Sequence, residues 1–174
     1  TDSWIHVGGD EVSLECWNTS SSIQQWMQHH NLTVVELLEF FERRLLKSVM
    51  KKGRRPIAWQ DLTDAGVNMP KEIVIDVWKD WLRDDAMVNL TKTGYNVILS
   101  ACWYLDHLNQ NWWNFYTCNP VDIRNATLAQ QRHVLGGHCS MWGERVDLTN
   151  FFLRVWPRAS SVAEVLWSGS PTVN

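Results

Sequence analysis

Residues 73–78 read Ile-Val-Ile-Asp-Val-Trp and are the clearest strand in the sequence. It is a β-branched and almost wholly apolar run without strict alternation, which is typical of a strand buried on both faces of a parallel sheet. Comparable strand-like segments lie at residues 3–7, 56–60 and 96–101, and a fifth begins at 133–136. Because helical patterns separate these segments, the sequence predicts βαβ units and therefore an α/β fold.

The helical patterns have recognisable boundaries. Thr33 and Glu36 form a capping box, which predicts the start of a long helix, and Gly53 is expected to end it. Its buried stripe is expected to consist of Leu38, Phe41, Leu45 and Val49. Further helices are expected from residues 20–21, from about 84 to 94, and over 158–167.

Composition restricts the class of protein. The 174 residues are 45% hydrophobic and 20% charged, with a formal net charge of −3, which argues against intrinsic disorder. A slightly acidic chain lacks the basic surface that nucleic acids require, so no nucleic-acid partner is expected. No apolar run approaches the roughly 20 residues that span a bilayer, so no membrane span is expected either.

Glycosylation signals and cysteines indicate the compartment. Asn-X-Ser/Thr sequons lie at Asn18, Asn31, Asn89 and Asn125, which favours a glycoprotein of the secretory pathway. The four cysteines lack the spacing of a metal site, so no metal is expected. Cys102 and Cys118 flank a tryptophan-rich segment and are a candidate disulfide, with buried free thiols as the alternative.

Aromatic and acidic residues follow the predicted strands. Tryptophan is unusually frequent, with 12 residues against five Phe and three Tyr. The clusters that follow the five strands are Asp10-Glu11, Trp59-Gln60-Asp61, Trp78-Lys79-Asp80, Trp103–Asp106 and Trp142-Gly143-Glu144. In a (β/α)₈ barrel the carboxyl ends of the strands meet at one mouth, where active sites lie. Indole faces and carboxylates together suit a sugar, although a single such Trp could equally be a core residue.

The sharpest of these clusters is Asp10-Glu11, which follows Gly8-Gly9. Adjacent carboxylates repel each other, so one is readily protonated and can act as a general acid while the other stays ionised. The two glycines allow a close backbone approach or a positive φ angle. The alternative is a solvated acidic turn or a helix N-cap.

Six motifs in order carry a resemblance to a known family. They are Ile-His-Val-Gly-Gly-Asp-Glu-Val, Ala-Trp-Gln-Asp, Val-Trp-Lys-Asp, Trp-Tyr-Leu-Asp, Trp-Gly-Glu and the segment 153–164, Leu-Arg-Val-Trp-Pro-Arg-Ala-Ser-Ser-Val-Ala-Glu. The series resembles the eukaryotic lysosomal β-N-acetylhexosaminidases. This resemblance implies a partial (β/α)₈ TIM barrel that holds strands four to eight. Residues 1–174 would then be part of one catalytic domain, since a whole barrel needs about 250 residues.

The resemblance also implies a reaction, the hydrolysis of terminal β-linked N-acetylglucosamine and N-acetylgalactosamine. Such enzymes use the substrate's own acetamido oxygen as the nucleophile and form an oxazolinium intermediate, an exception to the usual two-carboxylate scheme. By this resemblance Glu11 is the acid and base, Asp10 accepts the acetamido N–H, and Tyr104 donates to the acetamido oxygen.

Substrate-binding residues follow from the same resemblance. Trp59, Trp78 and Trp142 would wall the acetamido pocket, while Asp106 and Glu144 would bind hydroxyl groups of the terminal sugar. The implied partner is a glycan or glycoconjugate, no cofactor is implied, and the parent enzyme is expected to be a lysosomal or secreted dimer.

Two other functions remain open at this stage. The first is a carbohydrate-binding module that uses the same Trp residues without catalysis. The second is a conventional retaining glycosidase in which Asp106 or Glu144 is the nucleophile.

Overall fold

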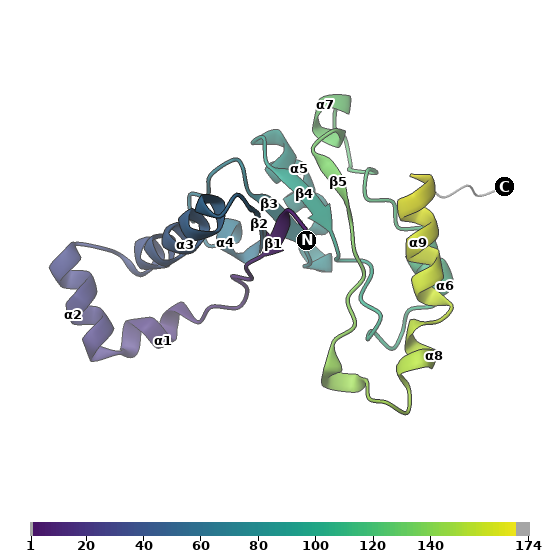
Figure 1. The fold of residues 1–174 in the computed structure, drawn as a ribbon, viewed down its shortest axis with the longest axis horizontal. Coiled ribbons are helices and arrows are strands. Elements are labelled where there is room, and N and C mark those ends of the chain that lie inside the picture. The colour runs from purple at the N-terminus through teal and green to yellow at the C-terminus, as the bar shows by residue number, and fades with distance from the viewer. Residues whose placement is uncertain (1, 170–174) are drawn as a thin grey trace. The chain divides into compact units, whose positions relative to one another are not determined.

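The computed structural model describes residues 2–169. The chain consists of two compact units, one up to Ile75 and one from Asp76 onward, so that the division falls within a strand. Five strands form a sheet in the order β1-β2-β3-β4-β5. Helices separate these strands along the chain (Figure 1), so the predicted α/β fold with a parallel sheet is confirmed.

The first unit begins with strand β1 (Trp4–His6). Helices α1 (Leu14–Thr19), α2 (Ser21–His30) and α3 (Val34–Lys51) connect it to strand β2 (Arg55–Trp59), which the short helix α4 (Asp61–Asp64) follows. β1 and β2 are parallel, with Trp4 opposite Arg55 and His6 opposite Ile57. Parallel neighbours of this kind need a long crossover, which α1 to α3 supply.

Helix α3 begins as its sequence predicts. The Thr33 side chain accepts from the Glu36 backbone N–H, and the Glu36 carboxylate accepts from the Thr33 backbone, so the capping box is complete. The pKa of the Glu36 carboxyl is lowered, because hydrogen bonds from Thr33 stabilise its charged form. The bond from the Thr33 backbone N–H has the larger effect, and the bond from the Thr33 hydroxyl has the smaller one.

The buried face of α3 differs from the expected stripe. Its buried residues are Leu38, Glu42, Leu46 and Val49, whereas Phe41 is exposed and Leu45 is only half-buried. The predicted buried face is displaced by about one residue from the observed one, because the prediction chose the hydrophobic Phe41 rather than the charged Glu42. The Glu42 side chain is 2% exposed, and burial raises the pKa of its carboxyl above the usual value. A carboxyl that protonates easily costs less to bury than a charged one.

Strand β3 (Val74–Val77), all of whose residues are buried, contains the division between the two units. A 3₁₀ turn, η1 (Asp80–Leu82), and helix α5 (Arg83–Lys92) lead to β4 (Asn96–Leu99), and α6 (Trp112–Tyr116) and α7 (Leu128–Gln131) lead to β5 (Val134–Gly137). The chain then continues through η2 (Gly143–Arg145), α8 (Phe151–Val155) and α9 (Arg158–Ser168). β4 and β5 are parallel, with a register shift between Val97 and Ile98.

A buried tryptophan anchors the core of the second unit. Trp103 is fully buried, and its indole N–H donates to the Phe115 carbonyl at 3.0 Å. Phe115 lies on α6, which packs against α9. This hydrogen bond satisfies the only polar atom of the indole, which allows the large Trp103 side chain to be buried in the core.

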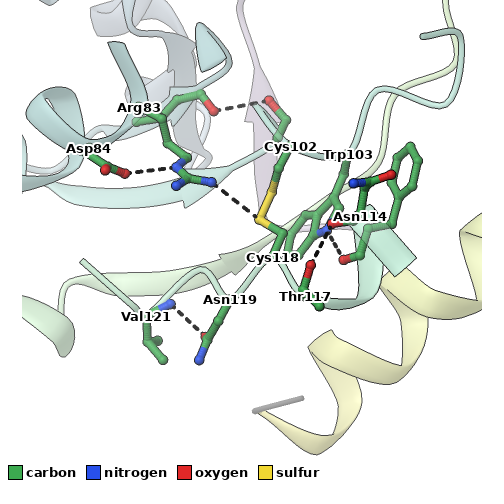
Figure 2. The surroundings of a disulfide bond; sticks show 12 residues. Arg83, Asp84, Cys102, Trp103, Asn114, Thr117, Cys118, Asn119 and Val121 are labelled. Carbon is green, nitrogen blue, oxygen red and sulfur yellow. Dashed lines mark hydrogen bonds and ion pairs between the residues drawn. A yellow bond between two sulfur atoms is a disulfide. The ribbon is translucent and has the colours of Figure 1, made fainter. Parts of the chain in front are cut away.

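A disulfide closes the loop between Trp103 and α6. Cys102 and Cys118 are bonded, as Figure 2 shows, and Trp103 lies beside the bond. The described residues leave Cys16 and Cys139 as free thiols at exposed positions. Because the bridge cross-links a segment of 16 residues, it restricts the unfolded chain as well as the folded loop.

Gly137 at the end of β5 is expected to be intolerant of a side chain. A Cβ atom at this position would lie 2.1 Å from the Leu99 carbonyl oxygen and 2.5 Å from Cζ3 of Trp103. Neither the β4 backbone nor a buried indole can give way, so Gly137→Ala should lower the free energy of unfolding by about 1–3 kcal/mol or more. The measurement is urea-induced unfolding of the two proteins.

Gly143→Ala is the matched control, because no atom lies within 4 Å of a Cβ built there. Equal unfolding free energies for the two variants would contradict the clash at Gly137.

Between residues 2 and 169, no helix combines the length and the apolar character that a membrane-spanning segment requires.

Candidate active site

The first unit carries the acidic pair directly after β1. Gly8 and Gly9 both have positive φ angles, and a Cβ on Gly9 would approach Cδ1 of Leu62 to 2.8 Å. Glu11 also has a positive φ, of 50°, which is uncommon for a residue with a side chain. The Glu11 backbone N–H lies 3.4 Å from Oδ1 of Asp61. The two glycines therefore permit the turn, and Glu11 completes it with a backbone conformation that is strained for a residue with a side chain.

Trp59 lies close to this turn, at the end of β2. Its backbone N–H donates to the Gly8 carbonyl at 3.0 Å, and its indole contacts the His6 ring with centroids 4.6 Å apart. The indole is buried, and the backbone contact places Trp59 beside the turn that carries Asp10-Glu11. His6 also accepts from the Gly8 backbone N–H through Nδ1, at 3.1 Å.

The second unit contains a row of aromatic rings from the segments that follow β3, β4 and β5 in the chain. The ring of Tyr104 stacks on Trp78 with centroids 6.4 Å apart and an interplanar angle of 25°. The Tyr104 ring also contacts Trp142, with centroids 6.5 Å apart. Tyr104 is itself fixed by a parallel bridge to Ser140. Three of the residues that sequence analysis assigned to substrate contact in this unit therefore have their rings in one row.

Asp106 follows this row and has an unused acceptor. Its Oδ1 atom is buried and has no hydrogen-bond partner among the side chains and backbone described. An unpaired buried acceptor costs free energy unless a ligand supplies the donor. A sugar hydroxyl is a donor of the required kind. Glu144, the other predicted hydroxyl acceptor, lies on η2 at an exposed position.

Arg158 positions the segment that carries Asp106, a role that sequence analysis missed. Its guanidinium donates to the carbonyls of Leu105, His107 and Gln110, and it lies over the Phe115 ring at 5.3 Å. Burial lowers the pKa of Arg158, although the nearby Asp106 carboxylate opposes this effect. The available signal was an arginine inside the otherwise apolar face of the last predicted helix.

A second missed cluster lies around Asp76 in β3. This carboxylate is fully buried, accepts from the Ser100 hydroxyl at 2.8 Å, and binds Nε2 of His138 at 2.6 Å. The Asp76 hydrogen bond raises the pKa of His138 above its usual value, and the burial of the imidazole opposes this only in part. A single aspartate inside an apolar strand was the signal that could have revealed this network.

The Asp76–His138 pair should make stability depend on pH. Because the pKa of folded His138 lies above 6.5, its usual value, the pair stabilises the fold fully at pH values below 6.5. This stabilisation is lost as the pH rises through the folded pKa. We therefore expect the thermal midpoint to fall as the pH rises above 6.5 and through the folded pKa, and we expect His138→Gln to remove this step. A wild-type midpoint that is flat, or that rises with pH, would contradict the assignment.

The remaining predicted sites are distributed over the surface. Asn18, Asn31, Asn89 and Asn125 all occupy exposed positions, which is compatible with their use as glycan acceptors but does not test it. No group of three His, Cys, Asp or Glu side chains within residues 2–169 could hold a metal ion.

The structure is that of an α/β protein with a parallel sheet and with acidic and aromatic residues after the carboxyl ends of its strands. The chain belongs to glycosyl hydrolase family 20, since residues 1–170 match the catalytic domain of that family. The subunit beta of β-hexosaminidase from Sus scrofa is 42% identical over 96% of this chain, and the subunit alpha from Mus musculus is 36% identical over 99% of it. These matches confirm the resemblance that the six motifs carry.

The solved structures give the same fold. The chitobiase of Flavobacterium johnsoniae superposes with a TM-score of 0.82 at 29% identity, over 95% of this chain and 26% of that one. This likeness confirms the predicted partial barrel. The chain spans about a third of the curated relatives that it matches, with 32% of the pig subunit and 34% of the mouse subunit covered.

Proposed function

We propose that this chain is part of a catalytic barrel, of which residues 1–174 form one portion. The enzyme would be an exo-acting glycosidase that removes terminal β-linked N-acetylglucosamine and N-acetylgalactosamine. Family membership supports glycoside hydrolysis. The observation that carries the proposal is the left-handed backbone of Glu11 directly after β1. A non-glycine residue in this region costs about 1–3 kcal/mol, and such strain is concentrated where a side chain is held for function.

The proposed reaction uses the substrate as its own nucleophile. The acetamido oxygen attacks the anomeric carbon, and the bond to the leaving oxygen breaks as Glu11 gives that oxygen its proton. Asp10 accepts the acetamido N–H and stabilises the positive charge of the oxazolinium ring. Water then attacks the anomeric carbon, gives a proton to Glu11, and opens the ring with retention of configuration.

The second unit would supply the binding surface. Tyr104 would donate its hydroxyl to the acetamido oxygen, and Trp78 and Trp142, whose rings both contact Tyr104, would contact the sugar. Trp59 would be a further wall of the acetamido pocket. The buried, unpaired Oδ1 of Asp106 would accept from a sugar hydroxyl, and Glu144 would accept from another.

The same proposal covers the setting of the enzyme. The four exposed sequons support a glycoprotein on the secretory route, with the lysosome or the exterior as its destination. The parent enzyme would be a dimer that acts on glycans or glycoconjugates.

A thiazoline analogue of the oxazolinium intermediate tests this mechanism in the intact enzyme. Substrate-assisted catalysis predicts that the analogue binds at least about 10²-fold more tightly than the substrate. It also predicts that the aryl β-glucoside, which lacks the acetamido group, is not cleaved at a significant rate. Weak analogue binding with equal cleavage of both glycosides would instead favour a carboxylate nucleophile, Asp106 or Glu144. Sugar binding without any turnover would favour a binding module.

A further inference from the structure

One buried carboxylate, Asp76 of β3, joins the carboxyl ends of three strands. The side chain is fully buried, and its Oδ1 accepts from the hydroxyl of Ser100, the first residue after β4, at 2.8 Å. Its Oδ2 lies 2.6 Å from Nε2 of His138, the first residue after β5. Because β4 lies between β3 and β5 in the sheet, the carboxylate links β3 to β5 across one strand. Breaking a buried pair of this kind is strongly unfavourable, so the bonds resist a separation of the three strand ends.

Each of these strand ends leads directly into one ring of the aromatic row. The three rings, which follow the three bonded residues by two to four positions, are those of Trp78, Tyr104 and Trp142. The Tyr104 ring contacts both of the others. A chain of two to four residues cannot carry its end far from a fixed anchor. The carboxylate of Asp76 therefore limits the distances among all three rings.

Backbone hydrogen bonds join the segment after β5 to the segment after β4. The Ser140 N–H donates to the Trp103 carbonyl at 3.0 Å, and the Leu105 N–H donates to the Ser140 carbonyl at 2.7 Å. These bonds form the parallel bridge between Ser140 and Tyr104. Ser140 lies two residues after His138, so a displacement of His138 would be passed to Tyr104 through the backbone.

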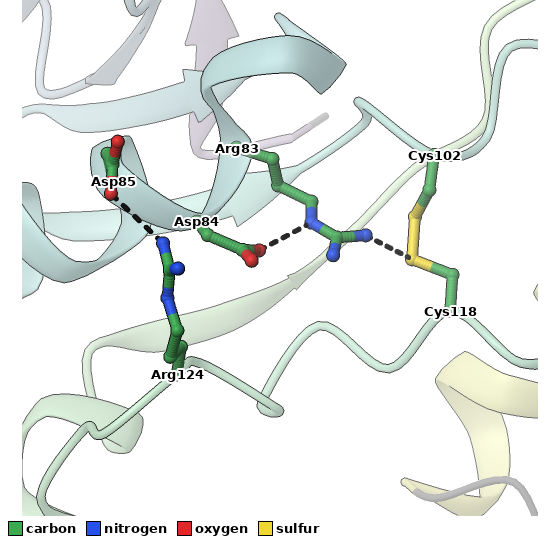
Figure 3. A network of polar contacts seen from close by, with 6 residues as sticks. All are labelled: Arg83, Asp84, Asp85, Cys102, Cys118 and Arg124. Atoms are coloured by element: carbon green, nitrogen blue, oxygen red, sulfur yellow. Dashed lines mark hydrogen bonds and ion pairs between the residues drawn. A yellow bond between two sulfur atoms is a disulfide. The ribbon is translucent and has the colours of Figure 1, made fainter.

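The segment after β4 has a second anchor. Cys102 is bonded to Cys118, and Nη1 of Arg83 lies 4.0 Å from the Cys118 sulfur. Figure 3 shows the Arg83 guanidinium between this disulfide and Asp84, whose Oδ1 lies 3.0 Å from Nε of Arg83. This anchor does not involve His138, so it remains when the His138 side chain is removed. Loss of the imidazole should therefore loosen mainly the segment after β5.

We propose that Asp76 and His138 are positioning residues, whose bond across β4 holds the rings of the aromatic row at the spacing that a sugar requires. The inference rests on the proposed function, which assigns the row to the terminal sugar. Both residues act through the rings that they place. The proposal also accounts for a carboxylate in β3, whose other residues, Val74, Ile75 and Val77, are all apolar.

Removal of the imidazole tests the proposal in the intact enzyme. In His138→Ala, kcat on an aryl N-acetyl-β-glucosaminide should fall about 10–10²-fold at a temperature well below the thermal midpoint, because a displacement of about 1 Å near the reacting atoms has an effect of this size. His138→Gln should regain most of this rate, since its amide can still donate to the Asp76 carboxylate. An unchanged kcat in His138→Ala would overturn the inference.

A double-mutant cycle with Tyr104 separates positioning from a general loss of stability. In the Tyr104→Phe background, His138→Ala should lower kcat only about two- to threefold further, because the hydroxyl that the bond positions is already absent. Losses that multiply in full would show that the two residues act independently, and the inference would then fail.

His133→Ala is the matched control, because it cuts a bond between the amino ends of the same strands. Nδ1 of His133, the residue before β5, lies 3.1 Å from Oδ1 of Asn96, the first residue of β4. The variant should be less stable than the wild type but should keep its kcat. If His133→Ala lowers kcat as much as His138→Ala does, the effect is a general loosening of the sheet and the inference is wrong.

The charge that His138→Ala leaves unpaired requires a second variant. Adding Asp76→Asn removes the buried charge without restoring the link to β5, so the double variant should unfold at a higher temperature than His138→Ala. Its kcat should nevertheless stay about 10–10²-fold below that of the wild type. Recovery of kcat together with stability would overturn the inference, and this outcome can be measured even if His138→Ala does not fold.

A readout without turnover separates this inference from the proposed function. In the enzyme labelled with 5-fluorotryptophan, the ¹⁹F resonance of Trp142 can be assigned by Trp142→Phe. It should shift or broaden in His138→Ala and stay unchanged in His133→Ala. If the wild type cleaves no N-acetylglucosaminide, the proposed function fails, but the positioning of the row still stands on this resonance. An unchanged resonance in His138→Ala would overturn the positioning role whatever the activity.

Discussion

Glu11→Gln should lower kcat by about 10²–10⁴-fold on glycosides with a poor leaving group, which is the usual contribution of a general acid. Glutamine keeps the size of the side chain but has no proton to give to the leaving oxygen. The loss should be much smaller on an aryl glycoside with an acidic phenol, because such a leaving group departs with little protonation. Steady-state kinetics on a pair of such substrates measures the difference.

Glu15→Gln is a suitable control for this comparison, because Glu15 is an exposed carboxylate in the first turn of α1. It should change neither rate. Equal losses on the two substrates in Glu11→Gln would mean that Glu11 is not the acid.

Tyr104→Phe should have the next largest effect, a loss of about 10²–10³ in kcat with a much smaller rise in KM. This is the typical effect of removing one donor that is aimed at charge developing in the transition state. The phenyl ring should keep the contacts with Trp78 and Trp142, so the fold and the sugar-binding surface are retained. Asp10→Asn should show the same pattern, because its carboxylate stabilises the positive charge that forms as the ring closes.

Tyr116→Phe offers a control for the loss of a phenolic hydroxyl, since Tyr116 lies on α6 and outside the aromatic row. A rise in KM with unchanged kcat in Tyr104→Phe would assign Tyr104 to binding alone.

The parts of the fold that the sequence predicts well are those set by local patterns. The apolar run around Val77 forms β3, and the pair Thr33 and Glu36 caps α3. Asp10-Glu11 lies in the turn after β1 because Gly8 and Gly9 can adopt positive φ angles there. Each of these features depends on residues close together in the chain, so its physical cause can be read from a short stretch.

The features that the sequence does not predict depend on distant partners. On α3, Glu42 is buried and Phe41 is exposed. The packing of the whole helix determines which face is buried, and the hydrophobicity of a single residue does not. Asp76 is bound by His138, 62 residues away, and no local rule pairs them. For Cys102 and Cys118 the sequence left a disulfide and free thiols open, and the structure shows the bond.

Arg158 has a consequence for the order in which the protein is made. The segment from Leu105 to Gln110 hydrogen-bonds to a guanidinium on α9, which the ribosome synthesises about 50 residues later. Until α9 has emerged and docked, three carbonyls of this segment lack their donor, so Asp106 cannot take up its final place. A nascent chain that stalls before α9 would therefore have a complete β4 but an unanchored Asp106 segment. The sugar contact that we propose for Asp106 would in this way depend on the synthesis of α9.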